Sequence, residues 1–218
     1  MAKPVLFVGN KNYSSWSLRP YMALKQSGIA FDEKLIRFGE PAFGNAIRKV
    51  SAAGQVPVLQ HGKLTIWDSL AILEYVAETW PSKNLWPKNR SARAMARSVC
   101  AEMHTGFGSL RNACPMNIRR PVKPIPMAEA VMKNLARIDS IWSVCRKNHG
   151  KGGDFLFGKF SNADAMFAPI ASRINTFDLK ISKANRAYVN AVLETKAYCA
   201  WKTDALQEPW MVAEDEVD

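Results

Sequence analysis

The chain has 218 residues, 48% of them hydrophobic, which is enough for one large domain or two small domains with real cores. No stretch reaches the roughly 18–20 uninterrupted apolar residues of a membrane span, and the apolar run within residues 1–10 is short and soon broken, so we expect no membrane partner and no secretory signal peptide. The formal charge is +11, but no RNA- or DNA-reading motif accompanies it, and we expect no nucleic-acid partner.

The first 80 residues alternate between short apolar runs and helical patterns. The predicted elements are a strand over 4–9, a helix over 18–26, a strand over 31–38, a loop and short helix over 39–50, a hairpin of 56–60 and 64–67, and a helix from 68 to Pro81. The order is therefore β-α-β-α-β-β-α.

Strand signals disappear after residue 88, and long amphipathic helices are predicted over 89–113, 126–147, 162–176, 184–194 and 195–206. The linker 80–87 is apolar enough to be packed, and the acidic end, Glu214 to Glu216, is expected to fray. An α/β half followed by an all-helical half predicts two domains, 1–82 and 83–218. Ser161 and Asp164 form a predicted capping box before the 162–176 helix.

The basic residues and the cysteines limit the chemistry further. Residues 81–153 hold 14 Lys and Arg against three acids, a pattern that suits attraction of a small anion or a solvated helical surface. The four cysteines are far apart, without a Cys-x-x-Cys pair, which favours reduced thiols in a cytoplasmic protein. Cys100 and His104 are four residues apart on a predicted helix, but two ligands do not make a zinc site, so we expect no metal.

The polar turn from Asn12 to Ser17 lies between the first strand and the first helix. Backbone N–H groups and the dipole at a helix start attract anions, and hydroxyl groups there can donate to a thiolate. The alternative is that the serines only cap the helix.

Two further segments offer polar groups to an extended ligand. In Gln55-Val56-Pro57, a cis bond before Pro57 would turn the Val56 backbone outward to pair with a peptide, whereas a trans proline would simply start a strand. Asp68 and Ser69 begin the third helix, where they could bind the ammonium and carboxylate of an amino-acid head or serve only as an N-cap.

The order and spacing of these three segments resemble the glutathione transferase superfamily. The serine turn looks most like the zeta and theta classes, and the segments GQVPVL (54–59) and WDSLAILEYVAE (67–78) are similar to the glutathione-binding segments of the family. The resemblance implies a thioredoxin-like N-terminal domain, an all-α C-terminal domain and a homodimer.

The resemblance also implies roles for particular residues, with glutathione as co-substrate. Ser14, counted back from Gly28-Ile29, would stabilise the thiolate, with Ser15 and Ser17 as rivals. Val56 before Pro57 would hold the cysteinyl backbone with help from Gln55, and Asp68 and Ser69 would hold the γ-glutamyl head. Trp16 stands where the zeta class usually carries Cys, which puts a zeta-type isomerase activity in question.

A second substrate is expected between the domains, against the first long helix. The candidate pocket residues are Trp16, Met103, His104, Phe107 and Arg111, with Arg111 or Arg173 as partners for a substrate carboxylate. The predicted function is a glutathione transferase that attacks a small electrophile. A glutathione-dependent isomerase, dehalogenase or peroxidase and a non-catalytic interaction protein stay open as alternatives.

Overall fold

The computed structural model describes residues 2–39 and 43–217. Its first part contains a four-stranded sheet in the order β2-β1-β3-β4, in which β2 is parallel to β1 and the others are antiparallel to their neighbours. The strands are β1 (Val5–Val8), β2 (Asp32–Leu35), β3 (Val58–His61) and β4 (Leu64–Trp67), and the helices are α1 (Ser15–Gln26), α2 (Phe43–Val50) and α3 (Ser69–Thr79). The predicted β-α-β-α-β-β-α order is confirmed.

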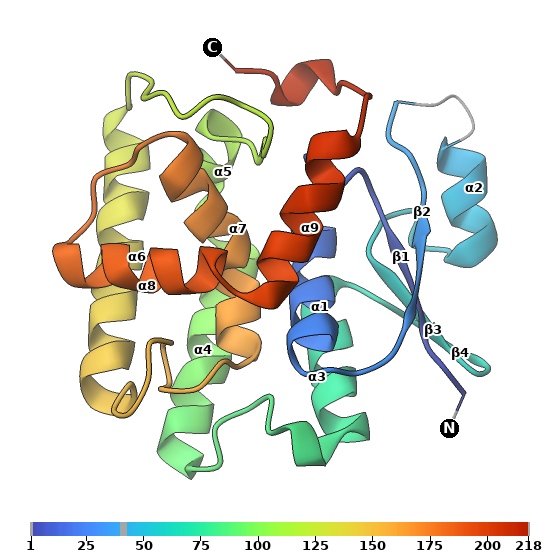
Figure 1. Cartoon of the computed structure of the whole chain (residues 1–218), viewed down its shortest axis with the longest axis horizontal. Coiled ribbons are helices and arrows are strands. Elements are labelled where there is room, and N and C mark those ends of the chain that lie inside the picture. Colours follow the sequence, from blue (N-terminus) through green and yellow to red (C-terminus); the bar gives the residue numbers. More distant parts are fainter. Residues whose placement is uncertain (1, 40–42, 218) are drawn as a thin grey trace.

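Helices cover both faces of the sheet (Figure 1). Both faces are apolar because successive side chains of β1, all of them apolar, point to opposite faces. Phe7 packs with Ile47 of α2, while Leu6 and Val8 belong to the larger core that includes α1 and α3. Helices α1 and α3 lie between the sheet and the helical part, and α2 lies on the outer side. The starts of α1 and α3 are therefore close to the second half of the chain.

The second part is helical, as predicted. A short 3₁₀ turn, η1 (Pro81–Lys83), leads into α4 (Arg90–Thr105), α5 (Gly108–Ala113), α6 (Glu129–His149), α7 (Asn162–Thr176), α8 (Lys183–Leu193) and α9 (Lys196–Gln207), and η2 (Ala213–Asp215) follows. The linker is packed, with Leu85 and Trp86 buried. No helix in the described ranges is both long and apolar enough to cross a membrane.

The predicted helix 89–113 is two helices, because the backbone turns at Gly106 and Phe107. Phe107 has a left-handed φ of 61°, and a Cβ on Gly106 would come within 2.6 Å of the Glu102 carbonyl oxygen. The turn therefore needs a glycine at position 106.

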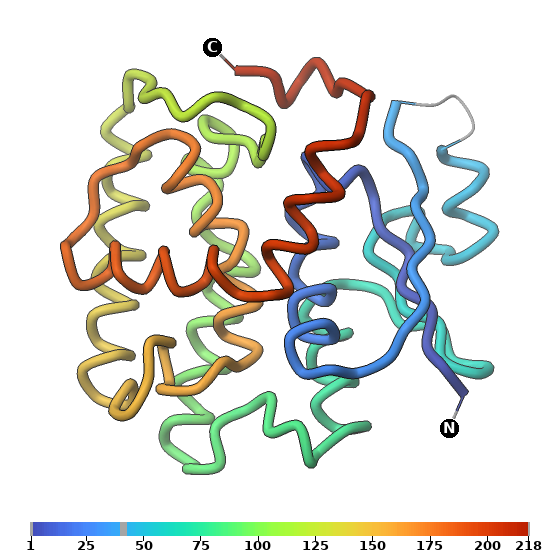
Figure 2. Tube along the Cα trace, viewed as in Figure 1, coloured from blue at the N-terminus to red at the C-terminus, as the bar shows by residue number. Residues whose placement is uncertain are grey.

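The expectation that the acidic end frays is wrong. The final segment, residues 209–217, turns back from α9 toward the loop after α5 (Figure 2). Glu216 accepts hydrogen bonds from Tyr13 and from Asn117 Nδ2, and Arg120 Nε donates to the Val217 carbonyl at 2.7 Å. These contacts hold the segment against the turn before α1.

Candidate functional site

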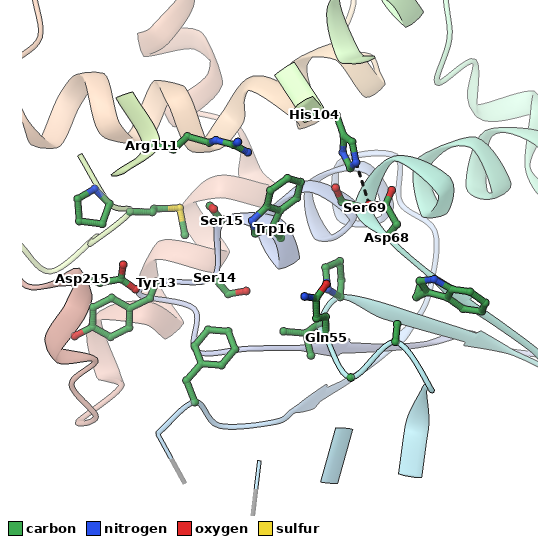
Figure 3. A pocket seen from close by; sticks show the side chains of 18 of the residues that line it. Tyr13, Ser14, Ser15, Trp16, Gln55, Asp68, Ser69, His104, Arg111 and Asp215 are labelled. Atoms are coloured by element: carbon green, nitrogen blue, oxygen red, sulfur yellow. Dashed lines mark ion pairs between the residues drawn. The ribbon is translucent and has the colours of Figure 1, made fainter. Parts of the chain in front are cut away.

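A cleft of about 970 Å³ opens where the starts of α1 and α3 face α4, α5 and the final segment (Figure 3). Both parts of the chain line it. From the predicted site residues, the cleft walls contain Ser14, Ser15, Trp16, Gln55, Val56, Pro57, Asp68, Ser69, His104, Arg111 and Arg173. The three segments that the sequence analysis selected therefore meet in one cavity.

Ser14 occupies the N-cap position of α1, yet its side chain makes no capping hydrogen bond. Its Oγ lies 2.7 Å from Ser17 Oγ, which also accepts from the Gly9 N–H at 3.1 Å. Ser17 is fully buried behind the turn, so only Ser14 and Ser15 of the three candidate serines reach the cleft. Figure 3 shows the Ser14 hydroxyl directed toward Gln55, while the Ser15 hydroxyl points toward the Arg111 side.

The second segment presents its backbone at the cleft wall. The Val56–Pro57 peptide bond is cis, which was the form required for Val56 to face a ligand. Both residues line the cavity, and β3 begins at the next residue, Val58. Gln55, exposed beside them, points into the cleft.

Asp68 is the N-cap of α3, Ser69 is the first residue of this helix, and both line the cavity. Asp68 Oδ1 accepts from the N–H groups of Leu70 at 2.8 Å and Ala71 at 3.1 Å, and the backbone φ of Asp68 is +72°. Non-glycine residues seldom adopt such a φ, and they do so most often at functional sites. The second oxygen, Oδ2, lies 3.2 Å from His104 Nε2 of α4.

Ser69 is backed by a buried cation. Arg19 of α1 is 1% exposed, and its Nη1 donates to Ser69 Oγ at 3.3 Å. Because Ser69 Oγ accepts this hydrogen bond, its own hydrogen is free to donate into the cleft. The Ser69 N–H belongs to the first turn of α3, where backbone N–H groups have no partner within the helix.

Trp16 lies at the centre of the cleft, between the Asp68 side and the Arg111 side. Its ring centroid is 4.0 Å from the Arg19 guanidinium carbon and 5.4 Å from that of Arg111, both within cation–π range. The edge-on contact with His104, with ring centroids 5.3 Å apart, places the imidazole on the Asp68 side. Trp16 thus divides the cleft into two halves.

Met103 and Phe107 do not line the cleft, contrary to the predicted pocket. Both are buried in the main hydrophobic core. Met103 lies on the buried face of α4. Phe107 follows the end of this helix at Thr105 and has a left-handed φ, so it does not continue the predicted helical stripe. His104 and Arg111 line the cavity.

Several residues that line the cleft were not predicted as site residues, among them Tyr13, Phe38, Pro115, Met116 and Asp215. Tyr13 could have been found, since it lies within the serine turn. Asp215 could not, because nothing local indicates that the final segment folds back.

Comparison with known proteins identifies the family. Residues 13–79 match the family model for the glutathione S-transferase N-terminal domain. The chain is 31% identical to a probable maleylacetoacetate isomerase of Caenorhabditis elegans over 89% of both proteins. The chain belongs to the glutathione S-transferase family. The match includes the serine turn, Val56-Pro57 and Asp68-Ser69, as expected from the resemblance.

Other relatives agree with membership of the glutathione S-transferase family. The chain is 29% identical to the maleylacetoacetate isomerase of Rattus norvegicus, across 83% of this chain and 82% of the rat protein. A glutathione transferase homologue from Drosophila mojavensis, solved with bound glutathione, has a TM-score of 0.72 at 18% identity over 95% of this chain and 94% of its own. The structural likeness confirms the predicted fold, a thioredoxin-like domain followed by a helical region.

Proposed function

We propose that the protein is a glutathione transferase that activates the glutathione thiol with Ser14. The observation that supports this most strongly is the Ser14 hydroxyl, which is free of helix capping and directed into a cleft shared with Val56, Asp68 and Ser69. A hydroxyl donor beside the bound sulfur favours the thiolate over the thiol, whose pKa is about 8.5 in a free cysteine. The thiolate would then attack an electrophile in the Arg111 half of the cleft.

Glutathione fits the Asp68 half of the cleft. Ser69 offers a hydroxyl and an N–H to the γ-glutamyl carboxylate, and Arg19 behind it adds positive charge. Asp68 would accept from the ammonium group with Oδ2, beside His104. The backbone of Val56 would pair with the cysteinyl residue, as an added strand does, with Gln55 nearby.

The choice between the two serines can be tested by single substitutions. Ser14→Ala should raise the pKa of the bound thiol and lower kcat/KM at pH 7 by about 10- to 100-fold, because a hydrogen bond to a charged group is lost. Affinity for glutathione, measured by isothermal titration calorimetry, should change little. Ser15→Ala is the matched control. Full activity in Ser14→Ala with loss in Ser15→Ala would show that Ser15 is the thiol-activating residue.

A glutathione-dependent isomerase is the second candidate, because the rat and nematode relatives that match most of the chain bear the name maleylacetoacetate isomerase. Stoichiometry separates the two functions. An isomerase regenerates glutathione and would convert maleylacetoacetate with catalytic glutathione, whereas a transferase consumes one glutathione per turnover. Trp16, at the centre of the cleft, is the feature that sets this chain apart from the zeta-class turn.

The remaining expectations follow from the family resemblance. A dehalogenase, a peroxidase and a non-catalytic interaction protein stay as alternatives; retention on glutathione resin without turnover of any electrophile would favour the last. A homodimer, a cytoplasmic location and a domain boundary near residue 82 also stay predictions. Light scattering after size-exclusion chromatography should give about twice the chain mass of 24.3 kDa.

A further inference from the structure

Three guanidinium groups surround the Arg111 half of the cleft. Arg111 is half-buried in its wall, Arg173 is 5% exposed and lines it, and Arg19 lies against Trp16. Within residues 2–39 and 43–217, no carboxylate oxygen comes within 4.0 Å of any of these guanidinium groups. Buried arginines are ordinarily paired, so this half of the cleft holds uncompensated positive charge.

The hydrogen bonds of these arginines leave donors unused. Arg173 Nε and Nη1 donate to the carbonyl groups of Cys114 at 2.6 Å and Pro169 at 3.3 Å, which brace the guanidinium between α5 and α7. In the described structure, Arg173 Nη2 makes no hydrogen bond, and Arg19 Nε is buried without a partner. Among the described residues, the Arg111 guanidinium makes no hydrogen bond or ion pair and lies over the Trp16 ring.

The three arginines form a cluster of positive charges. Burial, with repulsion from Arg111, lowers the pKa of Arg173 to about 10, and burial, with repulsion from Arg173 and Arg111, lowers the pKa of Arg19 to about 9. Burial also lowers the pKa of Arg111. All three carry their charge at pH 7, and Arg111 destabilises the charge of both Arg173 and Arg19 in the absence of an anion.

An opposing charge for Arg173 comes from the final segment. Asp215 is half-buried at the mouth of the same cavity, and it makes no ion pair within 4.0 Å among the described residues. The attachment of Glu216 to Tyr13 and Asn117 holds Asp215 in this place. The other acid of the cleft, Asp68, lies across Trp16 and already contacts the start of α3 and His104.

We propose that Arg111 and Arg173 form an anion subsite for the carboxylate of the electrophilic substrate, and that Asp215 is a counter-charge at the rim that weakens this binding. The proposal rests on the proposed function and names the substrate class. Arg111 offers free donors and a stacking partner in Trp16, which suits a planar carboxylate. Asp215 repels a carboxylate at this subsite, so its charge limits how strongly any small anion occupies the cleft.

The test compares two electrophiles that differ by a carboxylate, 1-chloro-2,4-dinitrobenzene and 4-chloro-3,5-dinitrobenzoate. In each reaction the sulfur forms a C–S bond to the ring, chloride leaves with the C–Cl electron pair, and the thiol proton passes to solvent. The ratio of kcat/KM for the benzoate to that for the neutral compound should fall by about 10- to 100-fold in Arg111→Met, because a charge-assisted hydrogen bond is lost. The ratio should rise about two- to fivefold in Asp215→Asn, since a partly exposed charge pair is worth less.

Two matched controls remove the same charges elsewhere. Arg90→Met changes an exposed arginine at the start of α4, and Glu214→Gln changes an exposed acid next to Asp215. Each control should leave the ratio of the two kcat/KM values nearly unchanged, because an exposed surface charge outside the cleft has only a small effect on an anionic substrate. An unchanged ratio in Arg111→Met, or equal effects of Asp215→Asn and Glu214→Gln, would overturn the proposal. Circular dichroism and the thermal midpoint of each variant show whether it folds.

Calorimetry separates a failure of this proposal from a failure of the proposed function. Binding of 3,5-dinitrobenzoate without glutathione, compared with neutral 1,3-dinitrobenzene, reports on the anion subsite alone and should weaken in Arg111→Met. If wild type turns over neither electrophile and binds no glutathione, the proposed function is wrong. If wild type binds both dinitro compounds equally, the anion subsite is wrong whatever the activity.

Discussion

At the scale of single residues, the hydrogen bond between Ser14 and Ser17 bears on the proposed role of Ser14 in activating a thiol. Ser14 Oγ donates to Ser17 Oγ, which also accepts from the Gly9 N–H. Both hydroxyl hydrogens can rotate, so with a sulfur bound Ser14 can donate to the sulfur while Ser17 donates to Ser14 Oγ. Under the proposed function Ser17 is a positioning residue, although it is fully buried and does not line the cleft.

The first prediction concerns Ser17→Ala. The change should leave Ser14 without its hydrogen-bond partner and raise the pKa of bound glutathione, lowering kcat/KM at pH 7 by about three- to tenfold. The pH profile of kcat/KM measures this, with its rising limb moved to higher pH. Ser98→Ala, which also removes a serine hydroxyl but on the exposed face of α4, is the control. A profile that keeps the wild-type limb while only the amplitude falls would indicate a structural effect alone.

The three candidate serines show how far the sequence predicts single site residues. The spacing to Val56-Pro57 and to Asp68-Ser69 identified the turn as a candidate site. Neighbouring residues of a turn point their side chains in different directions, and sequence spacing does not predict these directions. The structure shows that Ser17 is buried while Ser14 faces Gln55. The predictions for Met103 and Phe107 are wrong because spacing does not show which face of α4 packs into the core, nor that this helix ends at Thr105.

At the scale of elements, α7 lies between the two parts of the chain, and hydrogen bonds at its first turn hold its start in place. Asp164 accepts from Ser161 N–H at 2.8 Å, Ser161 Oγ at 2.9 Å and Leu156 N–H at 3.1 Å, and Asn162 donates to the Leu73 carbonyl of α3. The predicted capping box is confirmed. Short motifs of this kind are predictable because donor and acceptor are three residues apart.

The second prediction follows from the burial of Asp164, which raises its pKa to about 6, from 3.8. The folded state therefore binds the proton more tightly than the unfolded state does. Below about pH 4 the protonated Asp164 carboxyl contributes up to about 3 kcal/mol to the free energy of unfolding, and this contribution is lost as pH rises through about 6. Asn at this position does not titrate. The free energy of unfolding of wild type minus that of Asp164→Asn, from urea titrations, should fall between pH 4 and pH 6.

The matched control is Asp154→Asn, an exposed acid in the loop before α7. For this variant the difference from wild type should vary little over the same pH range. A wild-type minus Asp164→Asn difference that is flat from pH 4 to pH 6, or that rises, would contradict a raised pKa for Asp164.

At the scale of the whole molecule, the serine turn is held by residues about 200 positions away in the chain. Glu208, after α9, accepts from the backbone N–H groups of Lys11 at 2.7 Å and Asn12 at 3.0 Å. Lys11 Nζ lies 2.6 Å from carboxylate oxygens of both Glu33 and Asp204, and Trp201 Nε1 donates to the Lys11 carbonyl at 2.8 Å. None of these pairings leaves a local sequence pattern. The sequence therefore predicted most of the elements but not how the last ones position the first turn.

The third prediction tests this long-range support with Glu208→Ala. Two buried backbone donors lose their acceptor, which should lower the free energy of unfolding by about 2–4 kcal/mol. Since Lys11 and Asn12 lead directly into the Ser14 turn, kcat should also fall about tenfold through misplacement of the hydroxyl, although Glu208 does not line the cleft. Glu194→Ala, which changes an exposed acid after α8, should leave both quantities unchanged.

Activity is compared at a temperature where both variants are fully folded. A loss of kcat there reports on the position of the Ser14 hydroxyl and not on the fraction of folded protein. A Glu208→Ala protein that is less stable but has wild-type kcat would mean that the turn keeps its geometry without the last helix.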